Sequence, residues 1–212
     1  QFQVASAVAD PLSFGESKPD SPHRYLPMNS QFENALKDNL AKRSVGASAL
    51  RNQGRKGMIK AVHRFLGGIR PRELLALRSE RAFKRWLDDR TEELAREVGK
   101  SHGLQWGSAR KALNLWLRDL VYNHQFREAY GLGRLEPWLE VPLDSHTAKF
   151  IHRRSIQPLP DWTAIKEVTP DFSTAYQLAA RALVSSRELA YLAHPVHLDL
   201  VAWQMSSNSS EL

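Results

Sequence analysis

Two residues of this chain, Lys111 and Asp144, have side chains of the kind needed for nucleophilic attack on a sugar carbon of nucleic acid. Lys111 lies in WGSARKALN (106–114), where a tight Gly-containing turn is expected to lead into an amphipathic helix. Asp144 lies in EVPLDSH (140–146), where a Pro-bearing extended segment is expected to become a helix. An amine can act as a nucleophile, and a carboxylate can assist proton transfer or stabilise positive charge. The pair therefore suggests chemistry at the anomeric carbon of a nucleotide.

Each of these residues also has a purely structural interpretation. Lysines are mostly exposed in folded proteins, so Lys111 taken alone reads as a solvated helix residue. Asp is one of the favoured N-cap types, and Asp144 taken alone reads as a cap. A cap is compatible with catalysis, because it holds the carboxylate rigidly. Attack requires the neutral amine, which burial or the nearby cations Arg110 and Arg118 would favour. Asp144 is accordingly expected to stabilise the sugar cation rather than to pair with the ammonium group.

The elements that position the two residues are predicted to be helices almost throughout. Apolar residues recur with a helical period, and only 139–143 shows strand-like alternation. A capping-box pattern from Ser30 to Glu33 predicts a helix start, with Phe32 on its inward face. Further helices are expected over about 54–66, 79–98, 108–124, 144–154, 162–168, 171–187 and 195–205, with a possible turn at 88–90 and a Gly/Pro-punctuated link at 131–137.

The predicted fold is all-α, with one domain over 30–205 or two small helical lobes that share a cleft. Residues 1–29 contain several prolines and little periodicity, so they are predicted to form an arm or loop that is partly disordered. Residues 206–212 are rich in serine and are predicted to be a flexible tail.

The composition favours a polyanionic partner. The 212 residues include 30 Lys and Arg against 23 Asp and Glu, giving a net charge of +7 and a pI near 9.8. Such a field favours nucleic acid, and the alternative is a protein that is merely basic. The chain has no Cys, which excludes disulfides, thiolate zinc sites and Cys-ligated iron–sulfur clusters. No run approaches the ~18 apolar residues of a membrane span. The N-terminal stretch lacks a basic segment, so a cytoplasmic or nucleoid location is predicted.

Three short motifs together resemble the helix-hairpin-helix DNA glycosylase superfamily. RKALN (110–114), preceded by Gly107, Ser108 and Ala109, is similar to the family's Gly-Val-Gly-Arg-Lys-x-x-Asn hairpin. LDSH (143–146) resembles the Val-Asp-Thr-His that follows it. PVHLDLVAW (195–203) resembles Pro-Leu-His-Leu-Asp-x-x-x-Trp of the archaeal 8-oxoguanine glycosylase branch. In that branch the spacing between the hairpin lysine and the aspartate that follows it is similar to the 33 residues between Lys111 and Asp144. The motifs span about half of the chain, and Ala109 departs from the pattern at the second hairpin glycine.

The resemblance implies two helical lobes around a DNA-binding cleft, with the hairpin at about 100–120. It implies that Lys111 is the nucleophile and Asp144 its electrostatic partner in a bifunctional DNA N-glycosylase and AP lyase. Such an enzyme of base-excision repair flips out an oxidised purine, 8-oxoguanine above all, and cleaves the abasic site by β-elimination through a lysine Schiff base. Asp199 and Trp203 would hold the flipped base, with Asp199 accepting from a purine N–H. The alternative is that Trp203 is a core residue and Asp199 a surface residue or cap.

Further residues are predicted to contact DNA. The segment SALRNQ (48–53) loosely resembles a loop that inserts into the duplex in related enzymes, and GRKG (54–57) is a basic turn suited to phosphate contact. The predicted DNA-binding residues are Asn52, Gln53, Arg55, Lys56, Gly107, Ser108, Ala109, Arg110, Arg118 and His146.

The predicted partner is double-stranded DNA carrying a damaged or modified base, bound by a monomer. No metal site is predicted, because His194, His197 and Asp199 lack further clustered ligands. No cofactor is predicted either, apart from a monovalent cation at the hairpin backbone that the resemblance implies. Two alternatives stay open: a glycosylase of the same fold that acts on another modified base, and a non-catalytic helical DNA-binding module.

Overall fold

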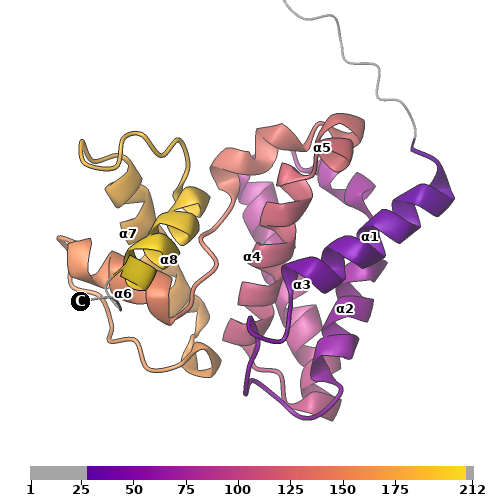
Figure 1. The fold of residues 1–212 in the computed structure, drawn as a ribbon, viewed down its shortest axis with the longest axis horizontal. Helices are drawn as coiled ribbons and strands as arrows, with labels where there is room; N and C mark the ends of the chain where they lie inside the picture. The colour runs from indigo at the N-terminus through magenta and orange to yellow at the C-terminus, as the bar shows by residue number, and fades with distance from the viewer. Residues whose placement is uncertain (1–27, 209–212) are drawn as a thin grey trace, which may run out of the picture.

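The protein is mostly helical in the computed structural model, which describes residues 28–208 (Figure 1). No strand occurs within this range, so the all-α prediction is confirmed for it. The alternating segment 139–143 is extended but does not pair with another strand in this range. The helices, with 3-10 helices written η, are α1 (Ser30–Ser44), α2 (Met58–Gly68), η1 (Pro71–Ala76), α3 (Glu80–His102), α4 (Trp106–Tyr122), α5 (His124–Tyr130), η2 (Leu132–Trp138), α6 (Ser145–Arg154), η3 (Ile165–Glu167), α7 (Pro170–Val184), η4 (Pro195–His197) and α8 (Leu198–Asn208).

The two terminal predictions fall largely outside the described residues. The arm predicted over 1–29 is described only at 28 and 29. The tail predicted over 206–212 is described only to 208, and residues 206–208 belong to α8; the rest of the predicted tail lies outside the described residues.

The start of α1 differs from the prediction. The side chain of Asn29 accepts hydrogen bonds from the N–H groups of Gln31 (2.9 Å) and Phe32 (3.2 Å), so Asn29 is the N-cap. The predicted Ser30 capping box is therefore wrong, because Asn29 already supplies the acceptor that the first turn needs. Phe32 is 50% exposed, so its predicted inward position is also wrong.

Other helix bounds move where a backbone turn intervenes. Gly57 adopts a positive φ of 93°, which breaks a helix, so α2 begins at Met58 and not at the predicted 54. Helix α3 runs through 88–90 without a turn and ends at His102, followed by the C-cap Gly103, whose φ is 77°. Helix α4 then begins at Trp106, two residues earlier than predicted. The link over 131–137 is mostly the 3-10 helix η2.

Buried apolar side chains form two clusters. One is built from α1 to α5 with η1 and η2, and the other from α6, α7 and α8. Figure 1 shows the same division, with α4 on the side of the first group that faces α8. Val196 in η4 belongs to the first cluster and Leu198 at the start of α8 to the second. The segment 195–198 and the extended segment 139–144 therefore both pass from one cluster to the other.

Candidate active site

Lys111 is buried where the two clusters meet. It lies on α4, the central helix of the first cluster, and its side chain is only 9% exposed. Its Nζ lies 3.3 Å from Oδ2 of Asp144, which precedes α6 in the second cluster. The interpretation of Lys111 as a solvated lysine is therefore wrong. The expectation that Asp144 does not pair with the ammonium group is also wrong for this structure.

Asp144 divides two roles between its two carboxylate oxygens. Oδ1 accepts hydrogen bonds from the N–H groups of His146 (2.9 Å) and Thr147 (3.0 Å), and the Thr147 hydroxyl accepts from the Asp144 N–H at 2.8 Å. This reciprocal arrangement is a capping box, so the predicted N-cap is confirmed. Oδ2 faces Lys111. Because the cap fixes the carboxylate through one oxygen, the other is held at the amine with little freedom to turn away.

The extended segment before Asp144 is anchored to α4 by a buried ion pair. The Arg110 guanidinium donates through Nε and Nη2 to the two oxygens of Glu140, each at 2.8 Å, and both side chains are less than a tenth exposed. Nη1 donates to Asp88 (2.7 Å) and Thr91 (3.0 Å) on α3. Burial opposes ionisation of Glu140, but Arg110 outweighs it and holds the pKa of Glu140 below its usual value.

Two consequences follow from this network. Removing one partner of a buried ion pair typically costs about 3–5 kcal/mol, so the network holds 139–144 in one position on α4. Arg110 is also fully committed inside the protein. It was predicted to contact DNA and to be a positive neighbour of Lys111, and its charge is balanced by Glu140 and Asp88.

The same segment is held from its other side by α7. The Gln177 side-chain amide donates to the Val141 C=O and accepts from the Val141 N–H, both at 2.9 Å. A side-chain amide thus replaces the neighbouring strand that an extended segment would otherwise need to satisfy its buried backbone. Asp144 is three residues further along the chain, so Gln177 and Glu140 together fix the position of the backbone from which its carboxylate extends.

A second charged pair adjoins the first. Arg118, seven residues after Lys111 on α4, donates through Nη1 to Oδ2 of Asp199 on α8. Its Nε donates to Asp119 at 2.9 Å. Burial, with a smaller contribution from the Asp144 charge, raises the pKa of Asp199 to about 6, while Arg118 and Lys111 oppose that rise. The electrostatic influence of Lys111 and Asp144 on Asp199 places the two pairs in one site. Like Arg110, Arg118 is paired with carboxylates, and its predicted contact with DNA stays a prediction.

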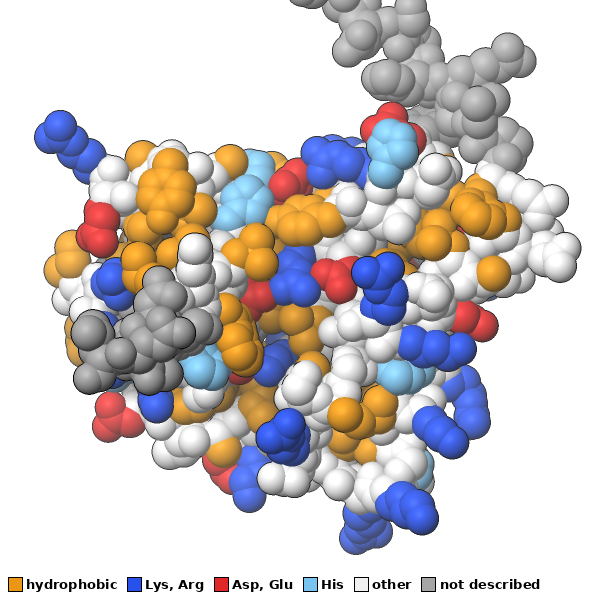
Figure 2. Space-filling view, in the orientation of Figure 1, with side chains coloured by type: hydrophobic (Ala, Val, Ile, Leu, Met, Phe, Trp, Pro, Cys, Tyr) orange, Lys and Arg blue, Asp and Glu red, His pale blue; other side chains and the backbone are white. Residues whose placement is uncertain are grey.

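The two residues predicted to bind a base differ in burial. Asp199 is 4% exposed, whereas Trp203, one turn later on α8, is 47% exposed. The alternative of a core Trp203 and a surface Asp199 is therefore wrong, because the burial is reversed. The Trp203 ring lies against the His146 ring, with centroids 4.2 Å apart. His146 thus connects the first turn of α6 to the Trp203 ring, which lies one turn from the buried Asp199 carboxylate. Figure 2 shows acidic and basic side chains together in the recess between the two groups of helices.

The small residues before Lys111 serve internal packing. Gly107, Ser108 and Ala109 lie within the first turn of α4, and the turn between α3 and α4 is Gly103–Gln105. All three residues are buried. The predicted tight turn at Gly107 is therefore wrong in position, and the absence of a side chain there admits the backbone of Ile165 and the side chain of Val168. Contact of this helix start with DNA stays a prediction.

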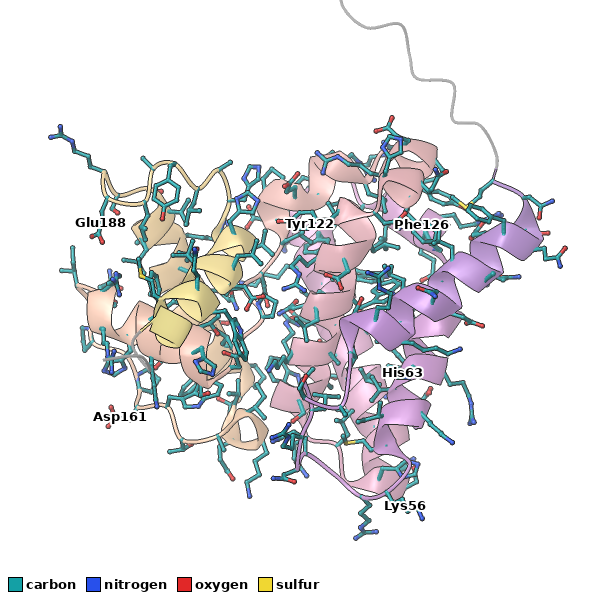
Figure 3. All side chains as sticks on the ribbon, in the orientation of Figure 1. Lys56, His63, Tyr122, Phe126, Asp161 and Glu188 are labelled. Carbon is teal, nitrogen blue, oxygen red and sulfur yellow. The ribbon has the colours of Figure 1, made fainter. Side chains whose placement is uncertain are left out.

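The predicted DNA-inserting loop borders the start of α4. The Ser108 hydroxyl donates to the Gln53 side-chain oxygen at 3.1 Å, which joins the loop to α4. Asn52 is exposed and adopts a positive φ of 60°. Arg55 and Lys56 are exposed and line a hollow of about 360 Å³ before α2, and Lys56 lies at the outer edge of the molecule in Figure 3. These residues are accessible to a large polyanion, although they are not part of the Lys111 site.

Sequence reasoning gave no role to Glu140 or Gln177. Glu140 precedes a Pro-containing segment and Gln177 lies on a mixed helix face, so neither has a local pattern that indicates its partner. Their partners are 30 and 36 residues away in the chain. Covariation between such positions is the signal that could have found them.

No cluster of three or more His, Asp or Glu residues suited to a metal ion occurs among residues 28–208. Over the same range, no helix is both long and apolar enough to cross a membrane. Comparison of the chain with protein-family models, with curated proteins and with solved structures finds no match.

Proposed function

We propose that this protein is a monomeric DNA glycosylase and AP lyase that excises an oxidised purine from duplex DNA, with Lys111 as nucleophile and Asp144 as its partner. The observation that supports this most directly is the buried contact between Lys111 Nζ and Asp144 Oδ2. Lys111 lies on a helix of the first apolar cluster and Asp144 at the N-terminus of a helix of the second, and their side chains meet between the two clusters. A lysine and a carboxylate held together in this way match the needs of attack on a sugar carbon followed by proton transfer.

The chemistry uses both groups. Asp144 Oδ2 accepts a proton from the Lys111 ammonium, and the neutral Nζ attacks C1′ while the bond to the base breaks and the base leaves with the electron pair. Asp144, protonated by the ammonium, gives that proton to the departing base; its carboxylate then takes a proton from the alkylated Lys111 nitrogen and delivers it to the ring oxygen as the C1′–O4′ bond breaks. The resulting iminium ion acidifies C2′, and loss of a C2′ proton expels the 3′ phosphate. Oδ1 remains on the helix cap throughout, so the carboxylate keeps its position.

The surroundings support a duplex substrate. The chain carries a net charge of +7, and the exposed Arg55 and Lys56 lie in a loop joined to the start of α4. We infer that α3, the turn at 103–105 and α4 form the hairpin that contacts the DNA backbone, and that the two groups of helices act as lobes around the DNA. Extruding a nucleotide costs a few kcal/mol, which contact of the flipped base with a pocket must offset.

Asp199 and Trp203 supply the elements of such a pocket. A buried carboxylate can accept a hydrogen bond from a base N–H, and a half-exposed indole beside His146 offers a face for stacking. An oxidised purine such as 8-oxoguanine has an N–H at position 7, where guanine has an acceptor. The carboxylate therefore favours the oxidised base over the normal one.

Borohydride trapping tests the proposal. Incubating the protein with a duplex that carries one abasic site, in the presence of sodium borohydride, should reduce the iminium ion to a stable covalent adduct. The adduct should form with the wild-type protein and disappear in Lys111→Gln. Lys149→Gln, which changes an exposed lysine on α6, is the matched control and should trap as well as wild type.

Either of two results would overturn the assignment. Failure of the wild-type protein to trap would remove the lyase, and trapping that persists in Lys111→Gln would assign it to another amine. Thermal unfolding of Lys111→Gln completes the test, because a folded variant shows that the loss is chemical. A panel of duplexes with single modified bases, 8-oxoguanine among them, then identifies the base that is excised.

A further inference from the structure

We propose that Arg118 is a positioning residue for base excision, acting through Asp199: it keeps that carboxylate ionised and oriented in the pocket, so that the pocket can accept a hydrogen bond from the flipped base. The proposal rests on the proposed function and assigns Arg118 a role inside the protein in place of a contact with the DNA backbone. It also predicts that base excision and strand cleavage differ in their dependence on Arg118.

The geometry of Arg118 supports this role. Its side chain is 18% exposed and binds two carboxylates, Asp119 on its own helix and Asp199 on α8. An arginine held by Asp119 cannot swing freely, so its Nη1 reaches Asp199 from a fixed direction. Arg118 donates to Oδ2 of Asp199, and we assign the other oxygen, Oδ1, to the base N–H. The structure thus holds an oriented acceptor beside Lys111 and Asp144.

The electrostatics explain why Asp199 needs Arg118. Asp199 is buried, and the Asp144 carboxylate from the N-cap of α6 also disfavours its ionisation. The groups that oppose this effect are both on α4, namely Lys111 and Arg118. Tyr122, one turn beyond Arg118 at the end of α4 (Figure 3), is kept neutral because burial raises its pKa to about 12. Arg118 is therefore the cation in direct contact that keeps Asp199 charged near neutral pH.

The pH dependence has a definite sign. Burial raises the pKa of Asp199 to about 6, so wild-type excision should fall as the pH drops through that value and the acceptor becomes protonated. Removing an arginine from contact with a carboxylate raises the carboxylate's pKa, typically by about one pH unit or more. The acid limb of the excision profile should therefore move to higher pH in Arg118→Gln, and a shift of one pH unit should lower excision near pH 6.5 by about three-fold. Raising the pH should restore it.

The histidines near Asp199 must be separated from this effect. His146 packs against Trp203, and His197 lies two residues before Asp199 and 3.3 Å from Glu136. Asp199→Asn removes the carboxylate and retains both histidines. If Asp199 sets the acid limb, that limb should disappear in Asp199→Asn, with a lower rate at all pH values.

The experiment measures two steps on two substrates. Single-turnover excision is followed on a duplex with one 8-oxoguanine from pH 5 to 9, and borohydride trapping is measured over the same range on a duplex with one abasic site, which has no base to recognise. Arg118→Gln should shift the first profile and leave the second near wild type, and Arg118→Lys, which keeps the charge, should recover part of the excision at pH 6.5. Arg90→Gln is the matched control, because Arg90 is a partly buried arginine paired with Glu73 and Glu93 outside the site.

The outcomes are distinct. Loss of excision at acid pH with recovery at high pH, and with trapping retained, supports the proposal. Equal loss of excision and trapping at every pH would mean that Arg118 is merely structural, and an unchanged excision profile would mean that it has no role in base binding; either overturns the proposal. Failure of the wild-type protein to trap on the abasic duplex would instead refute the proposed function itself.

Discussion

Gly107 has no room for a side chain, and this makes it a sharp test of how the site is built. A methyl group added to its Cα would lie 2.2 Å from the Ile165 carbonyl oxygen, 2.7 Å from Val168 Cβ and 3.1 Å from the Val168 carbonyl oxygen. Two of these atoms belong to the backbone, so a change of rotamer cannot relieve the contact. Gly107→Ala must therefore push the segment around η3 away from the start of α4.

The expected cost is about 2 kcal/mol of unfolding free energy. Overpacking typically costs about 1–3 kcal/mol, and contact with a backbone oxygen places this substitution at the upper end. Alanine returns up to about 1 kcal/mol through its higher helix propensity. In a protein of this size, a loss of about 2 kcal/mol lowers the melting temperature by about 4–8 °C.

Circular dichroism during thermal and urea unfolding measures the effect. Gly68→Ala is the matched control, because Gly68 ends α2 and an added methyl group there has no atom within 4 Å. The control should be neutral or stabilised by up to about 1 kcal/mol. The same substitution should thus destabilise the protein at 107 and not at 68.

One combination of results would refute this reasoning. If Gly107→Ala unfolds at the wild-type temperature and has lost affinity for duplex DNA, the glycine serves close approach of DNA, as the hairpin motif alone suggests. Reduced stability with a normal response of Gly68→Ala instead identifies the approach of residues 165–168 as the reason for glycine at this position.

Two further substitutions test the groups that line and support the site. Asp199→Asn should remove a pH dependence of the unfolding free energy. The pKa of Asp199 is raised to about 6 in the folded protein, so protonated Asp199 stabilises the wild type below about pH 4. This contribution of up to about 3 kcal/mol is lost as the pH rises through 6. Urea unfolding at pH 4, 5, 6 and 7 measures this, and parallel pH profiles for wild type and variant would contradict it. Gln177→Leu should lower the unfolding free energy by about 2–6 kcal/mol, because it leaves the buried N–H and C=O of Val141 without partners. The exposed neighbour Leu178→Ala should change it by less than about 0.5 kcal/mol, and similar values for the two variants would show that the Gln177 bonds are not limiting.

Some features of the site could be predicted from local sequence. The N-cap at Asp144 was predicted and confirmed, because a cap depends on a side chain and the backbone two or three residues beyond it. The start of α1 was predicted one residue late, because Asn29 and Ser30 are both good caps and the local sequence cannot choose between them. The start of α2 was missed because the conformation of Gly57, and not the apolar period, ends the preceding turn.

The sequence alone determined the helical class of the described chain and the candidate pair Lys111 and Asp144, because periodicity and capping are local properties. Only the tertiary structure decided that Lys111 is buried, that Arg110 serves Glu140, and that Arg118 serves Asp199 from 81 residues away. The physical reason is that a charge is stabilised or left unpaired by whichever groups the packing brings within a few ångströms, and that packing depends on how two apolar clusters meet. Local sequence does not indicate which residues of the two clusters come into contact.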